Sequence, residues 1–316
     1  MKKTNRSFLI ICLLSIITIL LITYSKEVIE SVSFSISIWK ENLFPSLFPF
    51  FVVSNLLIEY GFIELLGKYL GGLMPILFGL PKEASFILFI SMISGFPSSA
   101  KYTSRLVHEG VLSKEEGEQI LTFTHFANPL FILGFIGTSL LHNKTLAFLI
   151  LFCHISSNLI IGFLSKRKGL TKGKNEKKKN LNKKKNQLSF GSIFSKSIMD
   201  SLNTMLLLLG VVTCFLVLTT LLQNLIPMTS NTRILLSGLL EMTQGIKLVG
   251  EMSIPIFLKG LSILSFISFG GFSIHMQVLS FISEEHIKYF PYFWGRILQV
   301  ILASILYILL FPLVIQ

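Results

Sequence analysis

The sequence predicts an all-α, polytopic integral membrane protein built from two structural repeats with broken or re-entrant helices. Composition is the first observation: 52% of the 316 residues are hydrophobic and 14% are charged, whereas a soluble domain carries about 25% charged residues. Second, several apolar runs approach the ~20 residues with which a helix crosses a bilayer. Third, similar sets of interrupted apolar runs flank a strongly basic stretch. A soluble protein with an oversized core does not account for these features.

The N-terminal segment, residues 1–42, is expected to hold a transmembrane anchor followed by an amphipathic stretch. It begins with basic residues and continues with a mostly apolar run from Phe8 to Thr23. A secretory signal peptide begins in the same way, but only "YSKEVIE" follows, without an A-x-A-like cleavage site. We therefore interpret the run as an uncleaved first span whose basic end lies in the cytoplasm.

Residues 43–165 form the first predicted repeat. Ser113 and Glu116 have the spacing of a capping box, which predicts a helix over 112–123, and its polar composition places this helix on the surface. The apolar segments around it lie at about 43–60, 62–80, 84–97, 128–142 and 145–165.

Residues 166–187 are predicted to form a basic, disordered linker on the cytoplasmic side. Between positions 166 and 185 lie eleven Lys or Arg residues and one Glu, a net +10 of the chain's +12. Basic loops beside membrane segments stay in the cytoplasm, so an even number of crossings separates this loop from the N-terminus. Nucleic acid is not expected as a partner, because no aromatic residue is interleaved with the lysines.

Residues 188–316 form the second predicted repeat. A short helix over 283–290 ("SEEHIKYF") is expected as the counterpart of 112–123. The apolar segments lie at about 201–223, 232–250, 254–270 and 288–316. Interrupted segments in corresponding positions of two halves are typical of secondary transporters, whose site lies where the repeats meet.

The stretch "SGFPSSAKYTSRL" (94–106) is predicted to break a helix at membrane depth. Gly95 and Pro97 interrupt the run, and non-helical backbone at this depth survives only inside protein or beside a watery cavity. A helix that restarts at Pro97 or Ser98 would direct free N–H groups into the gap, where they favour an anion. Ser98 and Ser99 would add hydroxyl donors at this helix start.

Lys101 and Arg105 are four residues apart and therefore share one face of the restarted helix. Together with the helix start they predict a surface that binds a carboxylate. Two alternatives remain open for these cations: they reach out to lipid headgroups, or they form an internal ion pair.

The second half carries a polar helical face in "LLEMTQGIKLVGE" (239–251). Glu241, Gln244 and Lys247 follow one another at intervals of three residues. Charges among leucines are costly in lipid, so they should face a cavity or the bundle interior. We expect Gln244 and Lys247 to contact the solute in one chamber with Lys101, and Glu241 either to couple transport to an ion or to pair with Lys247 or Lys101.

Two further breaks are expected at Asn128-Pro129 and at Gly270-Gly271. Proline and paired glycines end helices and free backbone groups for an ion or a solute. The side chains of Asn128, His275 and Gln277 would add polar contacts. His275 could take part in proton coupling, or it could simply make an interhelical hydrogen bond.

No enzyme, cofactor or metal signature is present in the sequence. It contains no G-x-S-x-G, no H-E-x-x-H and no P-loop. The three cysteines lie in apolar runs without metal-ligand spacing. We therefore predict neither a cofactor nor a metal.

Three motifs, "SGFPSSAK", "FANPLFILGFIG" and "FGGFSIHMQV", occur in this order. They resemble the YlbJ family of sporulation integral membrane proteins, which carry nucleoside-recognition (gate) domains, and the resemblance extends from about residue 40 to 310. It implies a two-repeat architecture similar to that of concentrative nucleoside transporters. It also implies transport of dipicolinic acid across the outer forespore membrane of a sporulating bacterium.

A secondary carrier for a small anionic solute is thus the predicted function, with the lipid bilayer as the protein's surroundings. A proton or sodium ion is a candidate coupling ion, and an oligomer is compatible with the sequence. The alternatives are a passive channel for the same solute or for a nucleoside, and a sporulation scaffold that transports nothing.

Overall fold

The computed structural model describes residues 2–69, 71–166 and 189–315, and in these ranges the chain forms helices and no strands. The predicted linker 166–187 lies outside the described residues except for Lys166. Five helical segments are long and apolar enough to cross a membrane. This confirms the all-α polytopic membrane class. The five segments are Ser25–Glu59, Lys144–Leu164, Phe190–Leu225, Ile256–Ile282 and Phe290–Val314.

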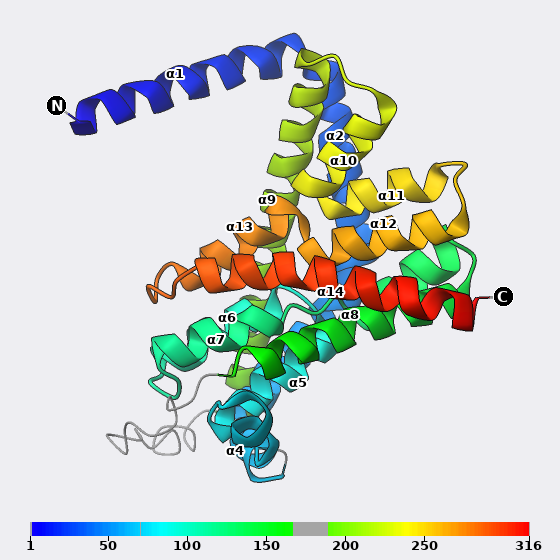
Figure 1. Cartoon of the computed structure of the whole chain (residues 1–316). Helices are drawn as coiled ribbons and strands as arrows, with labels where there is room; N and C mark the ends of the chain where they lie inside the picture. Colours follow the sequence, from blue (N-terminus) through cyan, green and yellow to red (C-terminus); the bar gives the residue numbers. More distant parts are fainter. Residues whose placement is uncertain (1, 70, 167–188, 316) are drawn as a thin grey trace.

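Two long helices run side by side through the molecule (Figure 1). One is a continuous run of α2 (Ser25–Ile38), the π-helical turn η1 (Trp39–Leu43) and α3 (Phe44–Glu59), and the other is α9 (Phe190–Leu225). Hydroxyl pairs join Ser31 to Thr220 at 2.5 Å and Ser35 to Thr213 at 2.7 Å. Asn55 donates to Ser201 at 3.1 Å. As the residue numbers rise along α2 and α3, the numbers of their hydrogen-bond partners on α9 fall. The two long helices are therefore antiparallel.

Shorter helices of the first half follow α3 and include both predicted breaks. The chain is helical up to Ser94, becomes helical again at Ser98, and is non-helical once more over 124–128. The elements are α4 (Phe62–Tyr69), η2 (Met74–Phe78), η3 (Lys82–Ala84), α5 (Ser85–Ser94), α6 (Ser98–His108), α7 (Lys114–Phe123), η4 (Phe131–Leu140) and α8 (Lys144–Leu164).

In the second half a similar order follows α9: a broken pair, a second broken pair and one long helix. The elements are α10 (Ser230–Leu240), α11 (Met242–Glu251), α12 (Ile256–Phe269), α13 (Gly271–Ile282) and α14 (Phe290–Val314). The helices α7, α8, α12 and α14 run across the direction of α9 (Figure 1).

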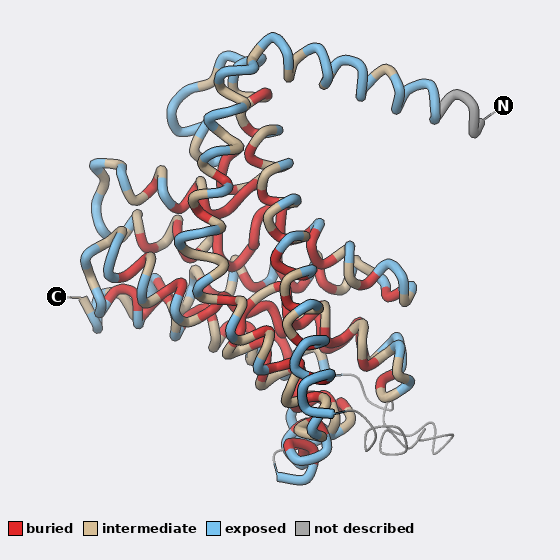
Figure 2. The backbone as a smooth tube through the Cα atoms, turned by 180° about the vertical axis from the view of Figure 1, so that it is seen from behind, coloured by how far each residue is buried: buried red, intermediate tan, exposed pale blue. Residues whose placement is uncertain are grey.

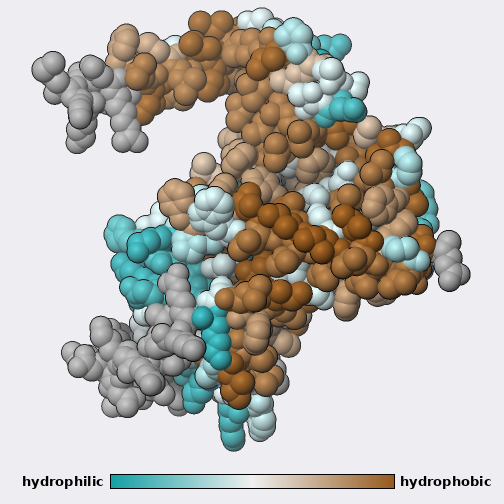
Figure 3. Space-filling view, in the orientation of Figure 1, coloured by the Kyte–Doolittle hydropathy of each residue, from teal (hydrophilic) through white to brown (hydrophobic). Residues whose placement is uncertain are grey.

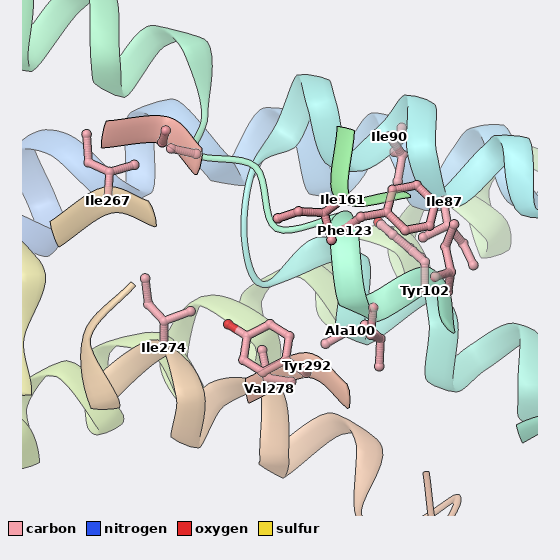
Figure 4. Packing of buried hydrophobic residues seen from close by; sticks show 14 of the residues in the cluster. Ile87, Ile90, Ala100, Tyr102, Phe123, Ile161, Ile267, Ile274, Val278 and Tyr292 are labelled. Atoms are coloured by element: carbon pink, nitrogen blue, oxygen red, sulfur yellow. The ribbon is translucent and has the colours of Figure 1, made fainter. Parts of the chain in front are cut away.

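The main hydrophobic core lies where the broken helices of both halves meet (Figure 2). It takes side chains from α5 to α8 and from α11 to α14. Figure 4 shows part of this cluster, with Ile87, Ile90, Ala100, Tyr102, Phe123, Ile161, Ile267, Ile274, Val278 and Tyr292 labelled. Because one core joins both halves, the breaks of each half are held against those of the other.

The N-terminal helix α1 (Lys2–Thr23) projects away from this body (Figures 1 and 2). Its large apolar side chains are mostly exposed, for example Phe8 and Ile22 at 65% and 72%. Its helical state agrees with an N-terminal anchor, and its crossing of a bilayer stays a prediction.

Two expectations about polar helices need correction. The capping box of α7 is present, with Ser113 N donating to Glu116 Oε2 at 2.7 Å, but most of α7 is buried because it packs between α6, α8 and α14. It is therefore not a surface helix. Residues 283–289 form turns rather than a helix, since His286 has φ +56° and the next helix starts at Phe290.

Candidate functional site

The first break closes on its own hydroxyl groups. Helix α5 ends at Ser94, and α6 begins at Ser98 as predicted. Ser94 Oγ donates to Ser98 Oγ at 2.7 Å, and Ser98 Oγ donates in turn to the carbonyl of Gly95. Ser98 and Ser99 are both buried. The hydroxyl of Ser98 is thus used to satisfy the interrupted backbone.

Asn128 connects the second break to the first. Its Nδ2 donates to the carbonyls of Ser94 and Ser46, both at 3.2 Å, and its Oδ1 accepts from Leu130 N at 2.7 Å. The carbonyl of Ser94 at the end of α5 therefore receives the bond that helix continuation would have supplied. Pro129 follows this non-helical stretch and is the first residue of the next helical segment.

The two breaks of the second half also meet each other. Gly270 and Gly271 both have positive φ, +90° and +67°. A Cβ on Gly271 would lie 3.0 Å from Met242 N, at the start of α11, and one on Gly270 would lie 2.8 Å from His125 Nε2. Since His125 belongs to the break after α7, all four interruptions converge in one region.

Glu241 sits between α10 and α11 and caps the second of these helices. Its carboxylate accepts from Gln244 N at 2.9 Å and from Thr243 Oγ1 at 3.0 Å, and the residue is buried. Among the residues that the structure describes, no cation forms an ion pair with Glu241. A capping role replaces the expected pairing with Lys247 or Lys101.

Lys101 points into a polar cavity of about 370 Å³ between α3, α6 and α9. Its ammonium donates to Thr204 Oγ1 at 2.8 Å and lies 5.2 Å from the ring centroid of Phe51. No carboxylate of the described chain lies within ion-pair distance of it. The cavity is lined by Asn55, Lys101, Arg105, His108, Glu109, Lys196, Asp200 and Asn203.

Arg105 lies in the same cavity but is already neutralised. It contacts Glu59 at 2.7 Å and Glu109 at 2.9 Å, and Lys196 lies 3.7 Å from the same Glu59. This geometry matches the alternative of an internal ion pair. Lys101 therefore remains as the cation of this cavity with no carboxylate at ion-pair distance, and the nearest compensating charge is that of Asp200, which lines the same cavity.

Lys247 does not join Lys101. Its ammonium lies 4.7 Å from the ring centroid of Phe34, whereas Lys101 approaches Phe51. These two rings are seventeen positions apart on one continuous helix, which corresponds to about 26 Å at the rise of an α-helix. The expected single chamber with Lys101, Gln244 and Lys247 is therefore not formed, because α6 and α11 approach different levels of the long helix. Gln244 Oε1 is buried without a hydrogen-bond partner.

His275 is a bridging residue in this structure. Its Nδ1 lies 2.6 Å from the hydroxyl of Tyr289, and its Nε2 lies 3.0 Å from the carbonyl of Phe269, which ends α12. This agrees with the alternative of an interhelical hydrogen bond. Gln277, two residues further along α13, is buried.

A buried network that the sequence patterns did not single out surrounds Arg296 of α14. This fully buried guanidinium donates to Thr122 O at 2.6 Å and also bonds Gln299 and Asn158. Nearby, His154 Nε2 accepts from Ala127 N at 3.0 Å. The sequence does contain a sign of this network, namely an arginine inside an apolar span. Such an arginine usually faces the protein interior.

No metal centre is formed by the described residues, since no group of three His, Cys, Asp or Glu side chains could hold an ion. The surroundings of Lys101 suit anion binding through hydrogen bonds instead. Asn203 supplies an amide group to the cavity beside the Lys101 ammonium, whereas the amide of Asn55 is bonded to Ser201 and Tyr102.

Comparison with known proteins gives two matches. A family model described as nucleoside recognition (Gate) matches residues 41–144. The chain is also 29% identical to the sporulation integral membrane protein YlbJ of Bacillus subtilis (strain 168), over 98% of this chain and 84% of that protein. No solved structure matches. These matches confirm the resemblance that the three sequence motifs carry.

Proposed function

We propose that this membrane protein, similar over nearly its whole length to a sporulation protein, is a secondary carrier for a small anionic solute. One observation carries the proposal. Lys101, in the first turn of the helix that restarts after the first break, faces a polar cavity and has no carboxylate within ion-pair distance among the described residues. An unpaired ammonium beside an amide donor favours a carboxylate. The family model that matches the first half, described by its recognition of nucleosides, is consistent with a solute-handling protein.

We further propose dipicolinic acid, a planar aromatic dicarboxylate, as the solute, and the outer forespore membrane as the site of transport. The similarity to a sporulation membrane protein supports this assignment. We propose an orientation in that membrane in which the N-terminus and the basic segment 166–185 lie on the cytoplasmic side.

An inverted repeat would explain how such a carrier alternates between two sides. Its support is that both halves have a long helix, two broken pairs and a closing helix, and that the two long helices are antiparallel. Lys101 and Lys247 then belong to two vestibules at different depths, rather than to one chamber. Ser98, Ser99, Asn128, His275 and Gln277 shape the breaks between them.

Replacing Lys101 tests the proposal directly. Loss of one charge-assisted hydrogen bond should reduce uptake by Lys101→Ala by about tenfold or more. The measurement is uptake of radiolabelled dipicolinate by purified protein in proteoliposomes. The control is Lys144→Ala, an exposed lysine at the start of α8, which should transport like the unchanged protein. Equal uptake by both variants at equal protein content would remove Lys101 from the site.

A second candidate function is passive movement of the solute or of a nucleoside, and the description of the matching family model favours a nucleoside as the solute. The same proteoliposomes separate the two candidates. A carrier coupled to protons or sodium accumulates dipicolinate only under the corresponding gradient, whereas a channel equilibrates it without one. Competition by nucleosides would identify them as the better solute.

A further inference from the structure

An apolar groove of about 380 Å³ lies between η2, α5 and the end of α8. Its floor includes the buried Met74 and Phe78, and its rim includes Leu73 and Phe163, which are 54% and 59% exposed. Ser85 is the polar residue of the lining, and its hydroxyl already donates to Lys82 O at 2.6 Å. The groove therefore offers an occupant apolar contacts and no free polar side chain.

The groove opens on a surface that a bilayer would cover. One of its walls is α8, a segment long and apolar enough to span a membrane. Figure 3 shows hydrophobic residues beside hydrophilic ones at the α4 and α5 end of the molecule. An unfilled groove forfeits dispersion contacts along its whole lining. The fluid hydrocarbon chains of the surrounding lipid are the apolar groups available to fill it.

Lysines border the groove at one end. Lys166, just beyond α8, donates to the carbonyl of Ile76 at 2.6 Å, and η2 with Ile76 supplies part of the lining. Lys82 packs along α4, where a Cβ on Gly67 would lie 3.7 Å from its Cγ. Neither lysine, nor Lys68 on α4, forms an ion pair within the described part of the chain.

The described acidic residues on the same elements form no ion pair with these lysines. Glu64 lies on α4 and Glu83 on η3, and neither makes an ion pair with a described lysine. Basic groups beside a groove between membrane helices attract anionic lipid headgroups, above all near the cytoplasmic leaflet. The basic segment that begins at Lys166 is expected on that side.

We propose that this groove binds one anionic phospholipid, with an acyl chain along Leu88 and Phe163 and its phosphate at Lys82 and Lys166. The site is separate from the polar cavity of Lys101, with which it shares no lining residue. A lipid held here braces α5, the helix that precedes the first break, against α8.

Native mass spectrometry of the purified full-length chain tests the site. The protein in detergent is titrated with phosphatidylglycerol or with phosphatidylcholine of the same acyl chains. Phosphatidylglycerol should form a single-lipid complex at a concentration about tenfold lower. Both lipids carry a phosphate, but phosphatidylcholine adds a choline cation that cancels its net charge and is repelled by the two lysines. Lys82→Gln with Lys166→Gln should abolish this preference, because it weakens the binding of phosphatidylglycerol far more than that of phosphatidylcholine. Leu88→Trp should fill the groove and lower binding of both lipids.

Matched controls keep the outcome decisive. Lys144→Gln removes a lysine from the other end of α8, and Phe148→Trp enlarges an exposed side chain of α8 outside the groove. Both should bind lipid as the unchanged protein does, and all variants must elute as the same folded species. Equal binding of the two lipids, or an equal loss in the control variants, overturns the proposal. A protein dimer that Leu88→Trp disrupts would assign the groove to a second copy of the chain and overturns it as well.

Discussion

At the scale of single residues, the buried charge of Arg296 is stabilised by oxygen atoms rather than by a carboxylate. Thr122 O, which accepts at 2.6 Å, lies in the last turn of α7, where the helix dipole is negative. Asn158 Oδ1 and Gln299 Oε1 provide further acceptors. Asn158 also donates to His125 O at 2.6 Å, so the same network holds the stretch after α7. Arg296 therefore supports the second break.

Substitution of Arg296 should destabilise the protein strongly. Arg296→Gln removes the charge but leaves buried acceptors without donors, at a cost of about 3 kcal/mol in the free energy of unfolding. The measurement is the unfolding temperature in detergent, followed by tryptophan fluorescence. Arg233→Gln, at an exposed position on α10, is the control and should change little. An unfolding temperature for Arg296→Gln that equals the control's would mean that the network contributes nothing to stability.

At the scale of elements, each broken helix is held by a neighbouring break. Gly95, with φ +77° and ψ −176°, brings its backbone against Asn128, and Gly271 lies against the start of α11. Only glycine adopts the first of these conformations readily. The hydroxyl and amide groups at the breaks satisfy the interrupted helix ends, so the polar backbone can remain inside the protein.

A methyl group at position 95 should therefore be poorly tolerated. In Gly95→Ala the new Cβ would lie 2.5 Å from Asn128 N, and the backbone strain alone costs about 1–3 kcal/mol. Both the unfolding temperature and the dipicolinate uptake should fall. Gly134→Ala in η4 is the matched control, since its Cβ would meet no atom within 4 Å. Normal stability and uptake in Gly95→Ala would contradict the close approach of these two breaks.

At the scale of the whole molecule, two antiparallel long helices cross a bundle made from both halves (Figure 1). The polar cavity lies against one level of these helices, and Lys247 lies against another. The proposed transport activity depends on how the two halves of the chain are positioned relative to each other. It does not depend on the sequence that connects them, provided the connection is long enough.

Neutralising the connecting segment tests this view against the scaffold alternative. Replacing the Lys and Arg residues of 167–185 with Ser keeps the length of the connection, and uptake in proteoliposomes should stay within about twofold, because the proposed solute contacts all lie outside this segment. Dipicolinate content of spores from a producing strain is the second measurement. If the variant transports normally in vitro but its spores lack dipicolinate as fully as a deletion strain, the segment acts by recruiting partners.

The sequence alone determined the features that depend on composition or on neighbouring residues. The membrane class followed from the apolar content, and the breaks at 95–97, 124–128 and 270 followed from glycine, proline and small polar residues. The capping box of Ser113 and Glu116 was equally local, because its partners are three residues apart.

Only the tertiary structure decided which side chains meet. It paired Arg105 with Glu59, left Lys101 beside Thr204, made Glu241 a helix cap, and separated Lys247 from the cavity. Helical spacing reports which face of its own helix a residue occupies. The position along another helix that this face contacts depends on packing between segments more than a hundred residues apart. The spacing of residues within either segment does not encode that position.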